Sequence, residues 1–168
     1  INFCIFHNER LYPGHERNIG ICNASNSLLA FLDTSTHPSN DWLSNGLNII
    51  NNNNYEGVWG KTYYQADKFL PKIFRASTYG EKPIKTLPGS ILHKNIFKKC
   101  GLFVESTRAG EDGDFMSRAR LHNVNICESE SFLNYDKLDK ISFKEIIKKW
   151  YRNHSHAASM PYLRAHKD

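Results

Sequence analysis

Three carboxylates stand within four positions in the stretch AGEDGDFMSR at residues 109–118. The stretch begins beside a glycine and runs into apolar, helix-compatible residues, so we expect the acids to open a helix. Asp112 then shares a face with apolar Phe115 and Met116, three and four positions on, and is predicted to sit at the edge of the core. A carboxylate held in this way can take the proton of a substrate hydroxyl, which makes Asp112 a candidate general base.

The same acidic cluster also has a purely structural explanation. Acidic side chains are favoured in the first turn of any helix, because they face its partial positive charge. Asp114 and Arg118 are four positions apart and are expected to form an ion pair across one helical turn. Spacing does not separate the catalytic from the structural interpretation, so both stay open.

Two further polar groups are candidates for ligand binding. The residues DTSTH at 33–37 directly follow LLAFL at 28–32, an apolar run typical of a buried parallel strand. Ligands of open α/β sheets bind outside the carboxyl ends of strands, where Asp33 would stand; its alternative is a helix cap or turn. The residues HERN at 15–18 suit a phosphate or a base, with a solvated turn as the alternative.

These groups require a scaffold in which strands and helices alternate. That alternation predicts an α/β domain with a mostly parallel sheet. The last predicted helix is amphipathic, with Phe143, Ile146, Ile147 and Trp150 on one face. We expect strands at 1–6, 28–32, 55–59, 89–92 and 124–127, helices at 15–24, from 38 to the asparagine run 51–54, 62–74, 94–100, 111–122 and 142–158, and a long loop at 75–88.

The composition is that of one folded domain. The length of 168 residues suits a single domain, and 40% hydrophobic with 23% charged residues excludes a disordered chain. The net charge of +5 is modest and its basic patches are interrupted by apolar residues, so we expect no nucleic-acid partner. No apolar stretch is long enough to span a bilayer. The four cysteines lie far apart without a CxxC pair, which favours reduced thiols in a cytoplasmic protein.

Taken together, two segments resemble family-2 glycosyltransferases. Residues 16–43, ERNIGICNASNSLLAFLDTSTHPSNDWL, resemble the family pattern "ARN-G---A-G-YI-FLD-D--P---WL". Residues 88–118, PGSILHKNIFKKCGLFVESTRAGEDGDFMSR, resemble its acceptor-side pattern "G----R---F---G-FDE----EDWDL--R". The segments occur in the family's order, and together they are more specific than either alone. The resemblance covers about residues 1–127.

The resemblance implies a GT-A fold of the Rossmann-like α/β class. Residues 1–130 would form the central and acceptor-side part of the domain, and residues 131–168 a C-terminal helical extension. The implied activity is inverting transfer of a sugar from a nucleotide-diphosphate-sugar donor to a hydroxyl of a glycan or lipid-linked acceptor, in cell-surface polysaccharide or lipopolysaccharide synthesis. The expected location is the cytoplasm or the inner face of the membrane, with a homo-oligomer as one possible assembly.

The resemblance also assigns roles on the acceptor side. Asp112 matches the second position of the family's "ED" motif and would be the base that removes the acceptor proton. Glu111 beside it would position the acceptor or the base. Arg118 would orient the acidic helix.

On the donor side the match departs from the family at one position. Asp33 matches the first aspartate of the DxD motif, which contacts the donor ribose and a Mn²⁺ or Mg²⁺ ion on the diphosphate, and Arg17 and Asn18 match the "RN" near the donor. Ser35 stands in place of the second acid, so metal dependence is open, with His37 as an alternative nitrogen ligand.

Two other function classes are considered. The strands with "P-YN" and "DDGS", which hold the nucleotide base in this family, have no counterpart before Ile1. We therefore expect either a piece of a longer enzyme or, as the alternative function, a non-catalytic binding or scaffolding module on the same fold. An unrelated α/β nucleotide hydrolase is disfavoured, because no GxxxxGK[ST] phosphate loop occurs.

Overall fold

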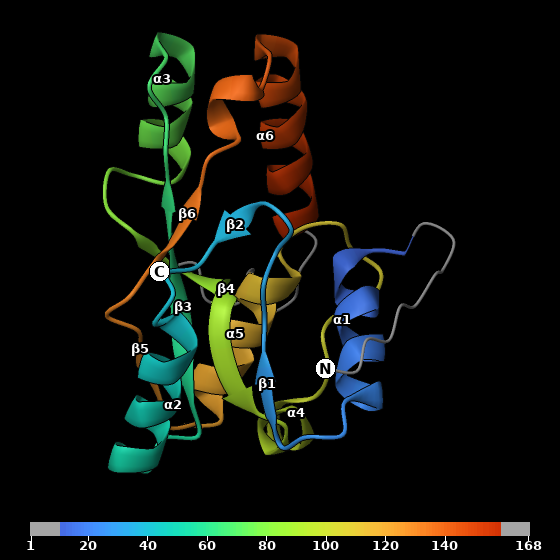
Figure 1. The fold of residues 1–168 in the computed structure, drawn as a ribbon. Coiled ribbons are helices and arrows are strands. Elements are labelled where there is room, and N and C mark those ends of the chain that lie inside the picture. Colours follow the sequence, from blue (N-terminus) through green and yellow to red (C-terminus); the bar gives the residue numbers. More distant parts are fainter. Residues whose placement is uncertain (1–10, 159–168) are drawn as a thin grey trace.

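The computed structural model describes residues 11–158, and the strand expected at residues 1–6 lies outside them. The described chain folds as an α/β unit (Figure 1). Its helices are α1 (Pro13–Asn23), α2 (Trp42–Asn53), α3 (Phe69–Thr78), α4 (Asn95–Cys100), α5 (Glu111–Leu121) and α6 (Phe143–Ala157), with a 3-10 turn at Leu138–Lys140. Its strands are β1 (Leu28–Ala30), β2 (Thr36–His37), β3 (Gly57–Tyr64), β4 (Ile84–His93), β5 (Ile126–Glu128) and β6 (Leu133–Tyr135).

The strands form one mixed sheet in the order β1-β4-β3-β6-β2, with β5 also paired to β3. Strand β4 is antiparallel to β1 and β3, and β2 is antiparallel to β6, whereas β5 and β6 are parallel to β3. The prediction of a mostly parallel sheet is therefore wrong for these strands. The reason is the position of α3, which lies beyond the end of the sheet, so the chain returns directly as β4 (Figure 1).

Strands β3 and β4 extend into ranges predicted as a helix, 62–74, and as a loop, 75–88. These two predictions are wrong in part, since α3 occupies only the last part of the first range and the start of the second. Thr62 and Thr86 are buried, and their hydroxyls lie 2.7 Å apart across the two strands. Such cross-strand pairs stabilise a sheet, and a polar residue paired in this way is not recognisable from its own neighbours.

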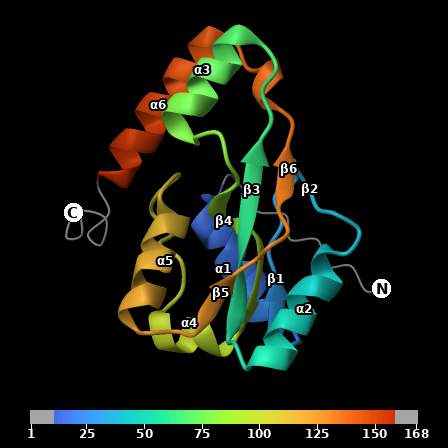
Figure 2. The ribbon, with the colours of Figure 1, turned by 90° about the vertical axis from the view of Figure 1, so that its left-hand side faces the viewer.

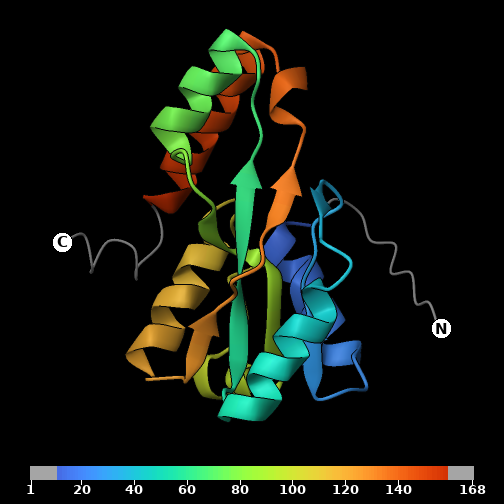
Figure 3. The ribbon, with the colours of Figure 1, turned by 60° about the vertical axis from the view of Figure 1, so that its left-hand side comes forward.

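Helices cover both faces of the sheet (Figures 2 and 3). Val58 packs with Trp42 and the rest of the α2 cluster on one face. Trp59, the next residue, belongs to the cluster of α1, α4 and α5 on the other face, where its ring lies 6.3 Å from that of Phe115. Phe115 also stacks on Phe97 at 4.8 Å. Because successive side chains of β3 point to opposite faces of the sheet, this strand contributes to the core on both sides.

Strand β1 differs from its prediction. The apolar run 28–32 pairs antiparallel with β4 and stands at the end of the strand order. Ala30 and Leu32 are exposed, while Leu28 and Leu29 pack into the two clusters on opposite faces. A continuous apolar run indicates that a strand packs on both of its faces, but it does not indicate whether the neighbouring strand is parallel or antiparallel.

The pairing of β3 with β4 is irregular at Gly60. A Cβ atom there would lie 2.1 Å from the carbonyl oxygen of Pro88 and 2.6 Å from the carbonyl carbon of Gly89, so the site requires glycine. The register shifts between Val58, opposite Ile91, and Gly60, opposite Thr86, so the extra residues lie on β4. Residues 57–59 of β3 pair with β5, and residues 62–64 pair with β6.

The segment expected as a helical extension, residues 131–168, contributes to the sheet as well. Its strand β6 pairs with β2 and β3, and α6 packs beside α3 at one end of the molecule (Figures 2 and 3). A third core cluster joins these helices through Phe74, Leu138 and Ile146. None of the helices between residues 11 and 158 is long and apolar enough to cross a membrane.

Candidate functional site

A cleft of about 990 Å³ is bounded by α1, the turn after β1, the beginning of α5 and the second half of α6. Strand ends of β3 and β6 contribute the aromatic part of its lining. Five residues that the sequence marks for chemistry line this cleft: Arg17, Asp33, Ser35, Glu111 and Asp112. The structure therefore brings together residues from two segments that are far apart in the sequence.

Arg17 connects these two segments. Its guanidinium donates a hydrogen bond to Oε1 of Glu111 at 2.5 Å, and a second nitrogen lies 3.8 Å from Oδ1 of Asp33. The side chains of Arg17 and Glu111 are 19% and 6% exposed, so this pair is largely shielded from water and more strongly coupled than a surface pair. The Asp33 side chain is 53% exposed, and its contact contributes little to stability.

Glu111 has a second carboxylate oxygen that is not used by the chain. The residue is 5% exposed, and none of the described residues offers a hydrogen-bond donor to its buried Oε2. An unsatisfied buried acceptor costs about 1–3 kcal/mol. Glu111 lines the cleft, but its Oε2 is enclosed by the chain rather than exposed there.

The predicted pair of Asp114 and Arg118 is confirmed, and it lies in the interior. The Asp114 side chain is 1% exposed and accepts a hydrogen bond from Nε of Arg118 at 2.9 Å. The other guanidinium nitrogens of Arg118 donate to the backbone carbonyls of residues 100–102. Arg118 thus fixes α5 against the end of α4, as its expected orienting role requires.

Asp112 lies at the edge of the core, as its spacing predicts, but it is not one of the acids that the helix buries. The buried stripe of α5 includes Glu111, Asp114, Phe115 and Arg118, and Asp112 lies to one side of it, half-buried and facing the cleft. Two acids occupy the stripe because each meets a guanidinium. A pattern of apolar residues does not indicate such pairing, so the burial of Glu111 and Asp114 was not predicted from it.

The amide of Asn18 is occupied by the chain itself. Its nitrogen donates to the carbonyl oxygen of Phe103 and to Oε1 of Glu105, both at 2.9 Å, and its oxygen accepts from the Phe103 backbone N–H. Asn18 is 4% exposed and is absent from the cleft lining. The donor contact expected for Asn18 is corrected to a positioning role, in which it holds the segment before α5 against α1.

The turn after β1 presents Asp33 at the cleft. The backbone N–H and the hydroxyl of Thr36 both donate to the Asp33 carbonyl, at 3.0 and 2.8 Å. The chain then pairs with β6 through β2, which holds the turn in place. The Ser35 hydroxyl accepts a hydrogen bond from Nζ of Lys137 at 2.8 Å.

The side chains around this turn do not fit a divalent cation. Mn²⁺ and Mg²⁺ need several oxygen ligands at one point. Here Asp33 faces a guanidinium, Ser35 an ammonium, and His37 lies 3.6 Å from a carboxylate oxygen of Asp136. Within residues 11–158 no three His, Cys, Asp or Glu side chains are grouped to hold a metal ion.

Three tyrosines in the cleft were not predicted from the sequence. Tyr64 and Tyr79 stack with ring centroids 3.8 Å apart, and Tyr135 is the third member of the group. Burial raises the pKa of Tyr64, and burial followed by the neighbouring Tyr135 raises the pKa of Tyr79 to about 12. Both side chains therefore stay neutral near pH 7, which leaves an uncharged aromatic surface beside the acids.

Two cations from α6 face the same cleft. Lys149 lies over the rings of Tyr135 and Tyr79, with Nζ 5.5 and 5.8 Å from their centroids, and Arg152 lies one turn further on. Burial, and then the charge of Arg152, lowers the pKa of Lys149. A signal was present in the sequence, because Lys149, Arg152 and Asn153 recur at helical spacing on the face opposite Ile147.

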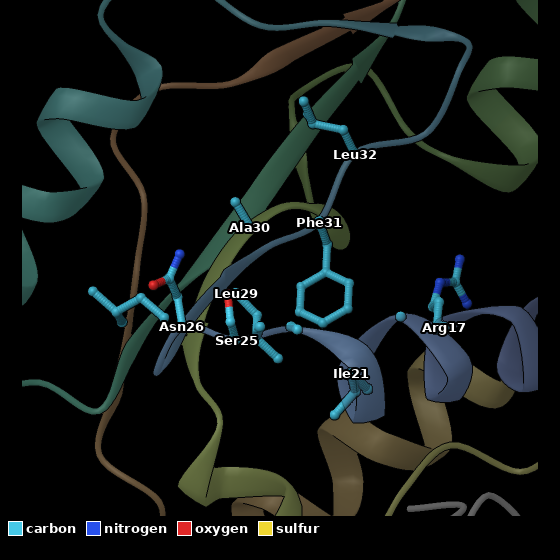
Figure 4. Close-up of a pocket in the computed structure, with 11 residues that line it drawn as sticks. Arg17, Ile21, Ser25, Asn26, Leu29, Ala30, Phe31 and Leu32 are labelled. Atoms are coloured by element: carbon cyan, nitrogen blue, oxygen red, sulfur yellow. The ribbon is translucent and has the colours of Figure 1, made fainter. Parts of the chain in front are cut away.

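A second cavity of about 430 Å³ lies between α1 and β1 (Figure 4). Its lining is mostly apolar and includes Ile21, Leu29 and Phe31, whose ring points towards α1 (Figure 4). Arg17 is the one titratable side chain among its lining residues. We assign no chemistry to this cavity, because Asp, Glu, His and Cys side chains are missing from that lining.

Sequence comparisons do not identify a family for this chain. No protein-family model matches it, and no curated protein matches it significantly. The functional argument therefore depends on the residues of the cleft.

Proposed function

We propose that the cleft is the acceptor-side and central part of an inverting glycosyltransferase of the GT-A type. Its substrates would be a nucleotide-diphosphate sugar and a hydroxyl of a glycan or lipid-linked acceptor, in cell-surface polysaccharide or lipopolysaccharide synthesis at the cytoplasmic side of the membrane. The observation that carries the proposal is Arg17, which contacts Asp33 of one resembling segment and Glu111 of the other.

Asp112 is the general base of this proposal. Among the described residues its carboxylate accepts one hydrogen bond, from the N–H of Gly113 at 2.8 Å, so the other oxygen is open to a substrate. It would take the acceptor proton while the acceptor oxygen attacks the anomeric carbon. The bond from that carbon to the diphosphate breaks on the opposite side, its electron pair leaves with the diphosphate, and the configuration inverts.

Glu111 positions the acceptor. Its buried Oε2 lacks a donor within the described chain, and a second hydroxyl of the acceptor sugar would provide one once a small shift of the side chain exposes this oxygen to the cleft. Arg17 holds the other oxygen, which prevents the carboxylate from turning away. An acceptor held at Glu111 lies beside Asp112, the next residue on the first turn of α5.

The leaving diphosphate meets side-chain cations. Arg17, Lys149 and Arg152 line the cleft, and fixed positive charges stabilise the negative charge that develops on a leaving group. The Mn²⁺ or Mg²⁺ ion implied by the resemblance does not fit the donor set around Asp33, so we derive no step through a metal. Asp33 remains the candidate contact for the donor ribose.

The test is a comparison of Asp112→Asn with Glu130→Gln in the full chain. Glu130 is an exposed acid outside the cleft, so its variant controls for the loss of one negative charge. Calorimetry with UDP and GDP measures donor binding, and radiolabelled sugar transfer measures the reaction. We expect Asp112→Asn to bind the nucleotide within about twofold of the unaltered chain and to lose transfer by about 10²–10⁴-fold, the usual contribution of a general base. Transfer at the unaltered rate would refute the assignment of the base.

A binding module without transfer is the second candidate. It is favoured by the ion pair of Arg17 with Glu111, which already neutralises two of the groups that the reaction would use. In that case the chain binds an anionic sugar or nucleotide in the cleft, and no donor and acceptor pair gives product. Lys149→Gln and Arg152→Gln would then weaken binding while Asp112→Asn leaves it unchanged.

A further inference from the structure

Exposed apolar side chains gather on the outer face of α3 and α6. Of the 13 large hydrophobic residues exposed in the described chain, 7 belong to this face, which we call the α3–α6 surface. They are Phe69, Leu70 and Ile73 on α3, and Phe143, Ile147, Trp150 and Tyr151 on α6. An apolar groove of about 200 Å³ runs between the two helices, and five of these seven side chains, all except Phe69 and Tyr151, line it. Contiguous exposed apolar surface of this kind marks an interaction site.

Lysines border this surface. Lys72 on α3 and Lys144 and Lys148 on α6 are exposed, at helical positions flanking the apolar residues. Helix α3 carries no acid, and the one acid of α6, Glu145, is bound to Ser142 in the capping box at the start of the helix. The two helices therefore place more positive than negative charge beside the apolar residues, and the nearby acid Asp139 is bound to the backbone at the start of α3.

We propose that the α3–α6 surface docks the protein on an anionic lipid bilayer. An amphipathic helix with Trp and Phe on its apolar face and Lys on its flanks lies in the plane of a membrane interface. Trp150 and Tyr151 have the amphipathic rings that settle at the level of the head groups. The chain does not cross the bilayer but lies on it, held by apolar insertion and by lysines near acidic lipids.

A second copy of the chain fits this surface less well. In a two-fold contact the same patch meets itself, so the lysines of both copies would approach each other around the apolar groove. Anionic head groups instead meet those lysines with opposite charge. Charge complementarity thus favours lipid over self-association.

Docking would also set the orientation of the cleft. Lys149 and Arg152 lie on the face of α6 that lines the cleft, whereas Ile147 and Trp150 lie on its outer face. The same helix therefore connects the membrane-facing surface with the cleft. The docking proposal is independent of the proposed function, since it needs no donor, acceptor or reaction.

Trp150 gives a direct readout of docking in the full, unlabelled chain. The protein has three tryptophans, and Trp42 and Trp59 are 8% and 7% exposed whereas Trp150 is 52% exposed. Vesicles of phosphatidylcholine with and without phosphatidylglycerol are added at low and high salt. We expect a blue shift of the emission and co-sedimentation only with phosphatidylglycerol vesicles, reduced at high salt because salt screens the lysines.

Variants separate docking from unspecific adhesion. Ile147→Glu should abolish co-sedimentation, and each of Lys72→Gln, Lys144→Gln and Lys148→Gln should reduce it about fivefold. Leu43→Glu is the matched control, because Leu43 is 46% and Ile147 is 51% exposed and Leu43 lies on α2, away from this surface. Circular dichroism verifies that each variant is folded.

Three results would overturn the proposal. One is equal binding to vesicles with and without phosphatidylglycerol, and another is equal loss of binding in Leu43→Glu and Ile147→Glu. The third is a dimer seen by sedimentation without vesicles and abolished by Ile147→Glu, with no lipid binding by the unaltered chain. That result would assign the surface to a second copy.

Discussion

Asp112 and Asp114 are two positions apart on the same helix, yet the structure gives them different environments. Asp114 is 1% exposed and bound to Arg118, whereas Asp112 is half-buried at the cleft and bound only to the neighbouring Gly113 N–H among the described residues. We therefore expect Asp114→Asn to destabilise the protein and Asp112→Asn to leave its stability nearly unchanged.

The size of the effect follows from the contacts of Arg118. Removing one partner of a buried ion pair costs about 3–5 kcal/mol, because the remaining charge stays buried without its counter-ion. In Asp114→Asn the guanidinium keeps its bonds to the carbonyls of residues 100–102, so the cost should fall at the low end, about 3 kcal/mol. For a domain of this length that corresponds to a fall of about 6–12 °C in Tm.

Urea denaturation followed by circular dichroism measures both variants under the same conditions. Asp112→Asn serves as the control for the loss of one negative charge on the first turns of α5, and it should stay within about 0.5 kcal/mol of the unaltered chain. Adding Arg118→Met, alone and combined with Asp114→Asn, gives the coupling energy of the pair from a double-mutant cycle. Equal destabilisation by Asp112→Asn and Asp114→Asn, or zero coupling in the cycle, would refute the assignment of Asp114 to the core.

Two further predictions concern the sheet and the tyrosine group. Because the fold raises the pKa of Tyr79 from 10.0 to about 12, the contribution of this hydroxyl to the free energy of unfolding is complete below pH 10 and is lost as the pH rises through 12. Tyr79→Phe keeps the stacked ring but has no hydroxyl to titrate. The urea midpoint of the variant should therefore fall less steeply between pH 10 and 12 than that of the unaltered chain, and parallel curves would contradict the prediction. Gly60→Ala forces a Cβ against the backbone at Pro88 and should lower the unfolding free energy by about 2–3 kcal/mol, whereas Gly20→Ala, where the Cβ meets nothing within 4 Å, should not.

Elements with a strong local signal were predicted well. Helices α1, α5 and α6 occur within two residues of their predicted ranges, α2 begins four residues after the predicted start at 38, and Gly101, with φ of 78°, follows α4 as expected. The boundaries failed at β3 and β4, where paired polar residues such as Thr62 look like loop or helix. The partner of Thr62, Thr86, is 24 positions away, so no local pattern predicts this pair.

In the candidate site, too, residues with a local sequence signal were predicted and residues without one were missed. Residue types and spacing identified Arg17, Asp33, Glu111 and Asp112, which do line one cleft. The tyrosine group and the cations of α6 were missed, because β3, β6, the end of α3 and α6 meet at the cleft only in the tertiary structure. Asn18 was predicted to lie near the donor, although its amide forms hydrogen bonds with the backbone of Phe103.

The sequence by itself determined which residues can do chemistry, the position of most helices and the alternation of helix and strand, since side-chain type and local spacing are sufficient for these. The tertiary structure decided the strand directions, the acid that is buried and the set of groups that share a cleft. The physical reason is that burial of an acid depends on its counter-ion and on the contacts that hold the counter-ion in place. Asp114 is stable inside because Arg118, four positions on, also reaches the carbonyls of residues 100–102, and Glu111 because Arg17 comes from α1.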